Sequence, residues 1–320
     1  MRDPAPESVI GDMETVTQVC STPVPSTLAP RMPAASAVVS TPVVLGGRYE
    51  LGPSVGLGGS GQVYQGLDRS LRRQVAVKVF HGGGASTGLP ARFDQEVRLH
   101  SRLHHSSLIP LLDAGREGGQ QYLVMPLVQG TTLAGLIASG PLAGHDVKRI
   151  GTALAGALEC VHSGGVVHRD VKPSNVLLGR DGQVFLADFG IACFRDGPEM
   201  TDAPQSSLTG TAAYLAPEQV ESGTIGYAGD VYALGLVLLE ALTGVRAYRG
   251  TPLEQALARL WRQPEIPHSL GPGWAGVLGG MTARDPVDRP NPRSIADILS
   301  CHDSLPISAA SLWRAGSVSS

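Results

Sequence analysis

The stretch that most constrains what this chain can be runs from Val166 to Asn175 (VVHRDVKPSN). An aspartate is followed there by a lysine two positions later and an asparagine five positions later. Asp170 can accept or orient a hydroxyl proton, Lys172 can balance charge on a phosphoryl group, and Asn175 can offer its amide oxygen to a divalent metal. The stretch therefore indicates phosphoryl transfer, provided that a nucleotide site exists elsewhere in the chain.

Length and composition place few limits on this chemistry. The 320 residues suffice for one large domain or two small lobes. The formal net charge of −3 gives no reason to expect nucleic acid or an anionic membrane as a partner. Four scattered cysteines favour a reduced, cytoplasmic setting. We expect no membrane span, and the longest apolar run, Val231 to Leu239, is predicted to be a buried core helix.

Changes in composition and in the periodicity of apolar residues divide the chain into segments. Residues 1–46 are rich in proline, serine and threonine and are predicted to be a disordered tail, either a plain extension or a regulatory one. Strands are predicted at 61–67, 74–80, 108–113 and 122–127, with one helix at 92–103. Helices are predicted at 147–162 and at about 229–243, 252–262, 272–282 and 292–301, before a short polar tail at 303–320.

A glycine-rich stretch, Val55 to Val63 (VGLGGSGQV), has the spacing G-x-G-x-x-G-x-V. Alone this is a weak signal, because a tight glycine hairpin has the same pattern. The predicted context is strand, turn and strand, which favours a loop over nucleotide phosphates and disfavours a dinucleotide-binding turn. Lys78 on the next predicted strand can reach beneath that loop. We expect its acidic partner on the following helix to be Glu96, with Asp94 as the alternative.

Taken in order, these features resemble the signature set of protein kinases. The matching residues are Gly56 to Val63, Lys78, Glu96, His168-Arg169-Asp170 with Asn175, Asp188-Phe189-Gly190 and Ala216-Pro217-Glu218. Over about residues 47–302 the chain is similar to the eukaryotic-like (Hanks-type) serine/threonine protein kinases of bacteria. This resemblance implies an α+β, bilobal protein-kinase fold. A small β-rich N-lobe with one helix would span about 47–126, and a larger, mostly helical C-lobe about 129–302.

The resemblance also implies ATP and Mg²⁺ (or Mn²⁺) as cofactors and a role for each matched residue. The catalytic set would be Asp170, Lys172, Lys78 and Glu96, and the metal set Asn175 and Asp188. The ATP-binding set would be Val55, Gly56, Leu57, Gly58, Gly59, Ser60, Gly61, Gln62, Val63, Ala76, Lys78, Met125, Pro126, Val128 and Leu177. In this set Val63, Ala76 and Leu177 would sandwich the adenine ring.

The segment Tyr122 to Val128 would link the two lobes, with Met125 as the gatekeeper. Pro126 stands where the family often has glutamate. Adenine recognition there uses a backbone carbonyl, which proline keeps, and then the N–H of Val128. We therefore expect nucleotide binding to survive this substitution.

Further residues are expected to support the site. By the resemblance, Glu218 would pair with Arg289, and Asp230 would cap the backbone of the catalytic loop. Thr211, after Gly210, would hydrogen-bond Asp170 and Lys172, an arrangement that favours serine and threonine as acceptors. His100 departs from the pattern, because the family usually has an apolar residue one turn after the glutamate.

Arg169 precedes the catalytic aspartate, which in the family marks enzymes switched by phosphorylation of the activation loop. We expect autophosphorylation in the segment 191–209. The candidate phosphosites are Thr201, Ser206, Ser207 and Thr209.

The expected function is that of an ATP-dependent kinase that phosphorylates serine and threonine hydroxyls of proteins, with homodimers as a means of trans-autophosphorylation. Two alternatives stay open. A pseudokinase scaffold or binding module is disfavoured by the presence of Lys78, Asp170, Asn175 and Asp188. A small-molecule phosphotransferase of the aminoglycoside type would lack the platform from Gly210 to Glu218.

Overall fold

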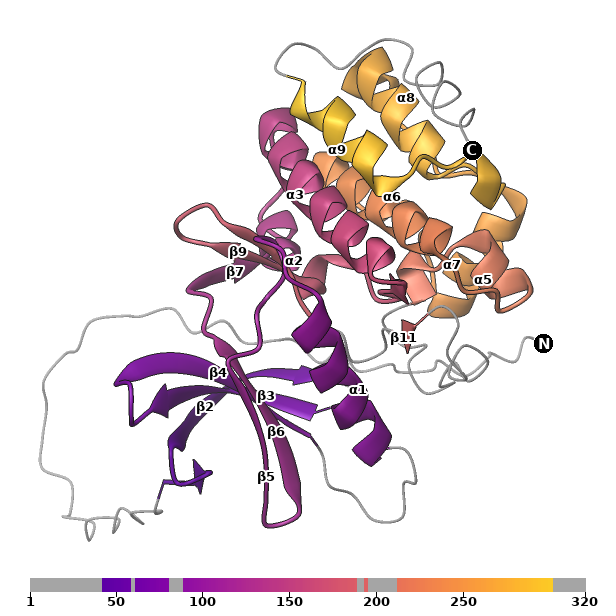
Figure 1. Ribbon diagram of the computed structural model, residues 1–320. Coiled ribbons are helices and arrows are strands. Elements are labelled where there is room, and N and C mark those ends of the chain that lie inside the picture. Colours follow the sequence, from indigo (N-terminus) through magenta and orange to yellow (C-terminus); the bar gives the residue numbers. More distant parts are fainter. Residues whose placement is uncertain (1–41, 59–60, 81–88, 189–192, 195–211, 302–320) are drawn as a thin grey trace, which may run out of the picture. The chain divides into compact units, whose positions relative to one another are not determined.

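The computed structural model describes residues 42–58, 61–80, 89–188, 193–194 and 212–301. Its N-terminal part is a six-stranded antiparallel sheet in the order β1-β2-β3-β4-β6-β5, with helix α1 (Leu89–Arg102) beside it (Figure 1). The strands are β1 (Val44–Leu45), β2 (Tyr49–Gly58), β3 (Gly61–Asp68), β4 (Arg73–Phe80), β5 (Asp113–Glu117) and β6 (Gln120–Pro126). The β-rich first part with its helix confirms the predicted architecture.

The two faces of this sheet differ because side chains alternate along each strand. Every second residue of β4 from Val75 to Val79 is a buried valine, in a cluster with residues of β1, β2 and β6. Phe80 lies on the other face with Lys78 and makes an edge-to-face contact with Phe93 of α1, the ring centroids 5.4 Å apart. The alternation therefore places Lys78 on the face that α1 covers.

The C-terminal part is mostly helical, as predicted (Figure 1). Its helices are α2 (Leu133–Ile137), α3 (Gly144–Ser163), α5 (Pro217–Glu221), α6 (Tyr227–Thr243), α7 (Pro252–Trp261), α8 (Gly271–Met281) and α9 (Pro292–Ser300). Two small sheets join them, β10-β9-β7 and β11-β8. Their strands are β7 (Gly130–Thr132), β8 (Val166–Val167), β9 (Val176–Gly179), β10 (Val184–Leu186) and β11 (Cys193–Phe194).

Helix α6 is the buried centre of this helical part. The run Val231 to Leu239 lies within it and is buried throughout, as predicted. Helix α3 packs against α6 and α9 (Figure 1). Gly151 allows the close approach, since a Cβ there would lie 2.7 Å from Leu299 and 3.1 Å from Leu238. No helix within the described ranges is long and apolar enough to cross a membrane.

The strand predicted at 108–113 is wrong. The sheet strand begins only at Asp113, and Leu108 makes an isolated bridge to Leu186 instead. Pro110 has no N–H to donate to a strand ladder. Leu108 and Ile109 are buried without belonging to a strand, and the segment reaches the sheet only near its end, where the N–H of Leu112 donates to the carbonyl of Val124 on β6.

The predicted tail boundary at residue 46 also needs correction. Strand β1 pairs with β2 inside that segment, and Leu45 is buried in the core of the sheet. A two-residue strand carries too short a pattern to be seen in a region rich in proline and serine. The remainder of the predicted tails, residues 1–41 and 303–320, lies outside the described residues.

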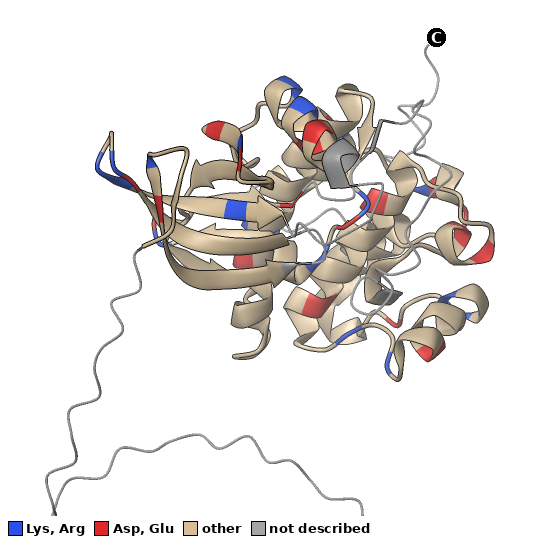
Figure 2. Cartoon of the chain, turned by 90° about the horizontal axis from the view of Figure 1, so that it is seen from below, with Lys and Arg blue, Asp and Glu red and all other residues tan. Residues whose placement is uncertain are grey.

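Charged residues of both signs are interspersed on the sheet and among the helices (Figure 2). This fits the near balance of 25 basic and 28 acidic residues in the sequence. A local excess of positive or negative charge on the surface is therefore due to the particular side chains at that place and not to the overall composition.

Candidate active site

The loop between β8 and β9 is held in place by a buried carboxylate. Asp230, in the first turn of α6, accepts hydrogen bonds from the backbone N–H groups of His168 (2.9 Å) and Arg169 (2.8 Å). Arg169 has a φ of 70°, which is unfavourable for a residue with a Cβ. The bonds to Asp230 stabilise this strained backbone, which confirms the expected capping role.

Asp230 is in turn held by His162 in the last turn of α3. His162 Nε2 donates to Asp230 Oδ2 at 2.8 Å, and its ring stacks on Tyr227 with centroids 4.6 Å apart. Burial opposes ionisation of Asp230, but the hydrogen bond from His162 and the nearby His168 outweigh it, so the pKa of Asp230 lies below its usual value. The carboxylate is therefore an ionised anchor beneath the loop.

Asp170, Lys172 and Asn175 are brought together by a short 3-10 turn, Pro173–Asn175. Lys172 Nζ donates to Asp170 Oδ2 at 2.7 Å, and Asn175 Nδ2 donates to the same oxygen at 2.8 Å. Asn175 Nδ2 also donates to the carbonyl oxygen of Asp170 at 2.9 Å. These bonds fix the carboxylate. They use only the amide nitrogen of Asn175, so Oδ1 has no hydrogen-bond partner among the described residues.

Lys78 connects two carboxylates from distant parts of the chain. Its Nζ donates to Glu96 Oε1 of α1 at 2.7 Å and to Asp188 Oδ1 at 2.8 Å. The predicted Lys78–Glu96 pair is confirmed, whereas Asp94, the alternative, pairs with Arg116. The direct contact with Asp188 was not predicted, and it joins β4 to the segment that follows β10.

This network keeps Lys78 protonated. Burial opposes the charged form, but Asp188 and Glu96 outweigh it and raise the pKa of Lys78. Burial raises the pKa of Glu96, whose Oε2 is buried without a hydrogen-bond partner in the part of the chain that the structure describes. Burial and then the charge of Lys78 lower the pKa of His100 to about 4. His100 is therefore neutral at pH 7, which suits its buried position on α1.

Two of the three residues predicted to sandwich adenine, Val63 and Ala76, lie on one face of the six-stranded sheet, with Lys78 and Met125 on the same face. Val63 lies opposite Lys78 in the β3–β4 pair, and Ala76 lies opposite Met125 in the β4–β6 pair. Residues that face one another across antiparallel strands project to the same side. All but Lys78 are half-buried, like Leu177 on β9.

The predicted glycine hairpin is formed by β2 and β3, which pair up to Gly58 opposite Gly61. Gly59 and Ser60, between them, lie outside the described residues. At Gly61 a Cβ would lie 2.4 Å from the backbone oxygen of Val79, so β3 can approach β4 there only without a side chain. This requirement explains one glycine of the motif without reference to a ligand.

Four other residues of the predicted nucleotide set lie in the second half of β2 or at the connection between β6 and β7. Val55 and Leu57 on β2 are 55% and 77% exposed, unusual for large apolar side chains. Pro126 ends β6, and Val128 follows it before β7. The structure thus places the predicted set on the sheet, the connection to the helical part and β9.

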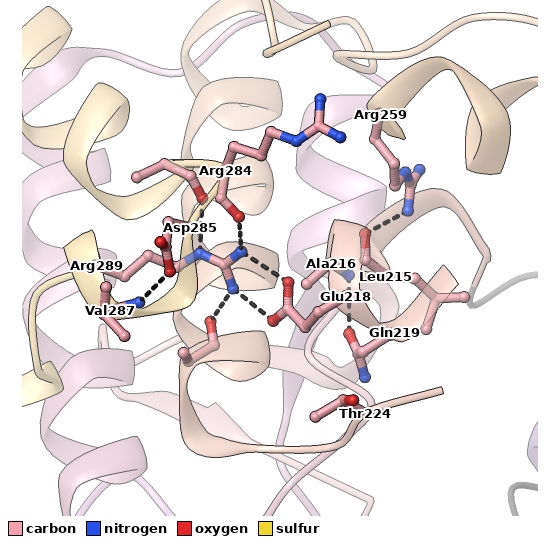
Figure 3. Close-up of polar contacts among 12 residues, drawn as sticks. Leu215, Ala216, Glu218, Gln219, Thr224, Arg259, Arg284, Asp285, Val287 and Arg289 are labelled. Carbon is pink, nitrogen blue, oxygen red and sulfur yellow. Dashed lines mark hydrogen bonds and ion pairs between the residues drawn. The ribbon is translucent and has the colours of Figure 1, made fainter. Parts of the chain in front are cut away.

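The segment after the undescribed stretch 195–211 is braced by an internal ion pair (Figure 3). Arg289 donates from Nη1 to Glu218 Oε1 at 2.7 Å and from Nη2 to Oε2 at 2.8 Å. It also donates to the backbone carbonyls of Ala283, Ala228 and Arg284. This two-pronged geometry, with a fully buried arginine side chain, confirms the predicted pair.

Several predicted residues cannot be placed. Outside the described residues lie Phe189, Gly190, Gly210, Thr211 and the candidate phosphosites Thr201, Ser206, Ser207 and Thr209. Their predicted roles remain predictions.

The oxygen donors of the site fit a divalent metal of the magnesium type. Asn175 Oδ1 has no other partner among the described residues, and the carboxylate of Asp188 is 35% exposed. The described residues contain no group of three or more His, Cys, Asp or Glu that could hold a metal alone. Mg²⁺ is commonly held by one or two carboxylates together with substrate phosphates, which this donor set matches.

Sequence reasoning missed three supporting residues. His162 and Tyr227 stabilise Asp230, and Arg259 of α7 donates to the backbone of the segment 213–215. For His162 the signal was its place at the end of a helix just before the motif. No signal in the sequence indicated a role for Arg259, because an arginine on a helix is usually exposed.

The sequence profile of the protein kinase domain matches residues 49–299. The chain is 37% identical over 255 residues to the serine/threonine-protein kinase PknL of Mycobacterium tuberculosis, covering 77% of this chain and 63% of the relative. It is 35% identical over 268 residues to PknH of the same organism, covering 81% and 42%, respectively. A probable serine/threonine-protein kinase of Streptomyces coelicolor is 35% identical over 284 residues, covering 85% and 42%.

The chain thus spans less than two thirds of the length of these relatives. The profile match covers both the sheet and the helical part. The order of the motifs and the bilobal α+β architecture agree with that match. The chain belongs to the protein kinase family.

Proposed function

We propose that this chain is an ATP-dependent serine/threonine protein kinase. The observation that carries the proposal is the pair of lysine–carboxylate centres, Lys78 with Glu96 and Asp188, and Lys172 with Asp170. The centre around Lys78 suits nucleotide phosphates and a metal, and the centre around Lys172 and Asp170 suits an acceptor hydroxyl. The names of the relatives, all serine/threonine-protein kinases, support the same acceptors.

In this proposal Asp170 aligns the hydroxyl of a serine or threonine and takes its proton as the oxygen bonds to the γ-phosphorus. At the same time the bond between the γ-phosphorus and the β–γ bridging oxygen of ATP breaks, and ADP is the leaving group. Lys172 and Asn175 hold the carboxylate in place through Oδ2. Lys172 also carries positive charge toward the transferring phosphoryl group. Little basicity is required, because alignment and charge neutralisation supply most of the rate enhancement.

Asn175 and Asp188 would hold Mg²⁺, which when bound neutralises phosphate charge and orients the nucleotide. Lys78 would contact the phosphates while Glu96 holds its ammonium in position. The glycine hairpin would cover the phosphates, and Val63, Ala76 and Leu177 would enclose adenine. The backbone of Pro126 and Val128 would recognise the adenine edge.

The test is transfer of radiolabel from [γ-³²P]ATP to a mixture of serine and threonine peptides by the full chain. We expect transfer by the wild type and none by Asp188→Ala. Circular dichroism and thermal unfolding would show that the variant is folded. If folded wild-type protein that binds ATP transfers no label, the scaffold alternative replaces this proposal.

We also infer regulation by autophosphorylation within residues 191–209, and a location in the cytoplasm. Arg169, next to Asp170, supports regulation by autophosphorylation, since an added phosphate would offset the charge of the arginine. The backbone of Arg169 is also strained, with a positive φ. The need for ATP and the free thiols of Cys160 and Cys301 support the second. Phosphopeptide mapping of active enzyme tests the regulation, and unmodified Thr201, Ser206, Ser207 and Thr209 would contradict it.

A further inference from the structure

The inward face of helix α7 holds a buried cation, Arg259, that the proposed reaction does not use. Its side chain is only 2% exposed and donates to the backbone carbonyls of Gln255, Ala213 and Leu215 (Figure 3 shows the bond to Leu215). Buried charges in proteins are normally paired with an opposite charge. No carboxylate pairs with Arg259 among the described residues, and burial lowers its pKa.

The neighbouring Arg289 shows how a buried arginine is ordinarily neutralised. Glu218 accepts two hydrogen bonds from its guanidinium group. Each of the two arginines also lies over a tyrosine ring, Arg289 over Tyr232 at 4.9 Å and Arg259 over Tyr248 at 5.1 Å from the ring centroid. Rings and carbonyls offer only partial negative charge. Arg259 therefore differs from Arg289 in having no full counter-charge in the described part of the chain.

A cavity of about 90 Å³ lies beside Arg259, on the side of α7 that faces the end of α8. This volume is several times the about 10–15 Å³ that one water molecule requires, so an ion larger than water fits. Arg262, Arg284 and Gln263 line the cavity together with Arg259, and no aspartate or glutamate is among its lining residues. The lining therefore offers hydrogen-bond donors and positive charge to whatever enters.

The two further arginines of the cavity are free to bind a ligand. Arg262 and Arg284 are exposed, and within the described ranges neither side chain donates a hydrogen bond or pairs with a carboxylate. The guanidinium of Arg262 lies 5.7 Å from the centroid of Tyr248, the ring that Arg259 also contacts. Figure 3 shows the side chain of Arg284 extending away from Arg289, on the side where Arg259 lies. Like charges around one small cavity repel one another, and an anion between them would relieve this repulsion.

We propose that this cavity binds a phosphate group, either as inorganic phosphate or as the phosphate monoester of a small metabolite. A guanidinium group binds oxyanions through paired N–H groups. A tetrahedral phosphate presents its oxygens in several directions and can meet the guanidinium groups of Arg259, Arg262 and Arg284 together. A carboxylate presents two oxygens in one plane and suits a single arginine better.

The phosphate site is linked to the segment next to the catalytic loop. The guanidinium of Arg259 holds the carbonyls of Ala213 and Leu215. Leu215 also lines a small cavity with Arg169, the residue before Asp170. An anion beside Arg259 would change the strength of the bonds to the two carbonyls. The resulting effect on acceptor binding rests on the proposed kinase function, whereas binding of the phosphate does not.

The test is calorimetric titration of the full chain, without nucleotide or Mg²⁺ and at constant ionic strength. The probes are inorganic phosphate, glycerol 3-phosphate, acetate and a phosphoserine peptide. The main variant is Arg262→Gln/Arg284→Gln, in which both substitutions are at exposed positions, with circular dichroism as the check of folding. Arg293→Gln, at an exposed arginine on α9, is the matched control, and Lys78→Met removes the lysine of the proposed nucleotide site.

We expect inorganic phosphate or glycerol 3-phosphate to bind at least about tenfold more tightly than acetate. The double arginine variant should lose at least about tenfold of this affinity, whereas Arg293→Gln and Lys78→Met should bind like the wild type. Tighter binding of inorganic phosphate would identify the free ion as the ligand, and tighter binding of glycerol 3-phosphate would identify a monoester.

Four results would overturn the assignment. These are equal affinity for phosphate and acetate, unchanged affinity in the double arginine variant, loss of binding in Lys78→Met, and binding of the phosphoserine peptide alone. The third result would place the phosphate in the nucleotide site, and the fourth would make the ligand a protein.

The link to the segment 213–215 has its own readout. In the wild type, saturating ligand should change the KM for an acceptor peptide by about fivefold, and in Arg262→Gln/Arg284→Gln it should not. A KM that the ligand leaves unchanged would overturn the link. Calorimetry requires no catalysis, so phosphate binding by a chain that transfers no phosphoryl group would refute the kinase proposal and leave the phosphate site standing.

Discussion

The two lysine–carboxylate centres are built in different ways. Lys172 and Asp170 are two residues apart, on one loop that Asp230 anchors through the backbone. Lys78 is 18 residues from Glu96 and 110 from Asp188, so its centre joins a strand, a helix and a later segment. The local centre keeps its geometry wherever the loop folds. The non-local centre exists only when α1 and Asp188 are both in position, so its geometry depends on how three distant segments pack together.

The local centre can be broken at the carboxylate itself. Asp170→Asn removes the group that we propose aligns the hydroxyl and accepts its proton, and we expect a loss of about a thousandfold in kcat with ATP affinity unchanged. Steady-state kinetics and nucleotide titration measure the two quantities. Asp297→Asn, an exposed aspartate on α9, is the matched control. A loss of less than tenfold would show that Asp170 does not act in the reaction.

The non-local centre can be broken at Glu96. Glu96→Gln removes the partner on α1 but leaves Lys78 paired with Asp188, so Lys78 should shift and kcat/KM should fall about a hundredfold. Asp94→Asn on the same helix, whose carboxylate pairs with Arg116, should have little effect. Equal effects of the two substitutions would contradict the assigned pair.

His100 beside the non-local centre predicts a pH dependence of stability. The unfolded chain binds a proton at His100 below pH 6.5, whereas the folded chain binds it only below about pH 4. Between these values the unfolded state binds more protons, so the stabilising contribution is full above pH 6.5 and is lost as the pH falls toward 4.

The free energy of unfolding should therefore change by about 2 kcal/mol from this residue, allowing for partial solvation of the protonated form. Urea unfolding of wild type and His100→Leu across this range measures it, and the difference between the two proteins should vary with pH. His104→Gln replaces an exposed histidine, so the free energy of unfolding of this variant should depend on pH as it does in the wild type. A constant difference would show that His100 does not titrate as described.

The anchor of the local centre can be weakened at His162. His162→Gln loses the stack on Tyr227 and weakens the hydrogen bond to Asp230, so the free energy of unfolding should fall by about 1 kcal/mol. We expect kcat to fall only a few-fold, because the two backbone bonds to Asp230 remain. Thermal unfolding and turnover measured together test this, and a loss as large as that of Asp170→Asn would make His162 more than a support.

The sequence predicted the contacts of the site correctly where the residues concerned lie close together in one motif. Asp170, Lys172 and Asn175 are close in the chain, so their contacts follow from one short motif. The Lys78–Glu96 pair was predicted from the position of Glu96 on the helix that follows the Lys78 strand, with Asp94 on the same helix as an alternative. The Lys78–Asp188 contact depends on how two distant segments meet, which no local pattern encodes.

Helix α7 shows where the sequence pattern misleads, because Leu253 and Leu257 are exposed and Arg259 is buried. Periodicity alone would turn Leu253 and Leu257 inward, since apolar residues usually face the core. The structure instead buries Arg259, because the carbonyls of Ala213 and Leu215 need donors there. The strand predicted at 108–113 failed for a related reason, since buried apolar residues need not be paired in a sheet.

The most direct test of the account is the chemistry of the product. The full chain is incubated with Mg²⁺, ATP and an equal mixture of serine, threonine and tyrosine peptides, and the phosphorylated residues are identified by mass spectrometry. The account predicts phosphate on serine and threonine, none on tyrosine, and none on any peptide with Asp170→Asn. Phosphotyrosine as the main product, or equal labelling by wild type and Asp170→Asn, would contradict it.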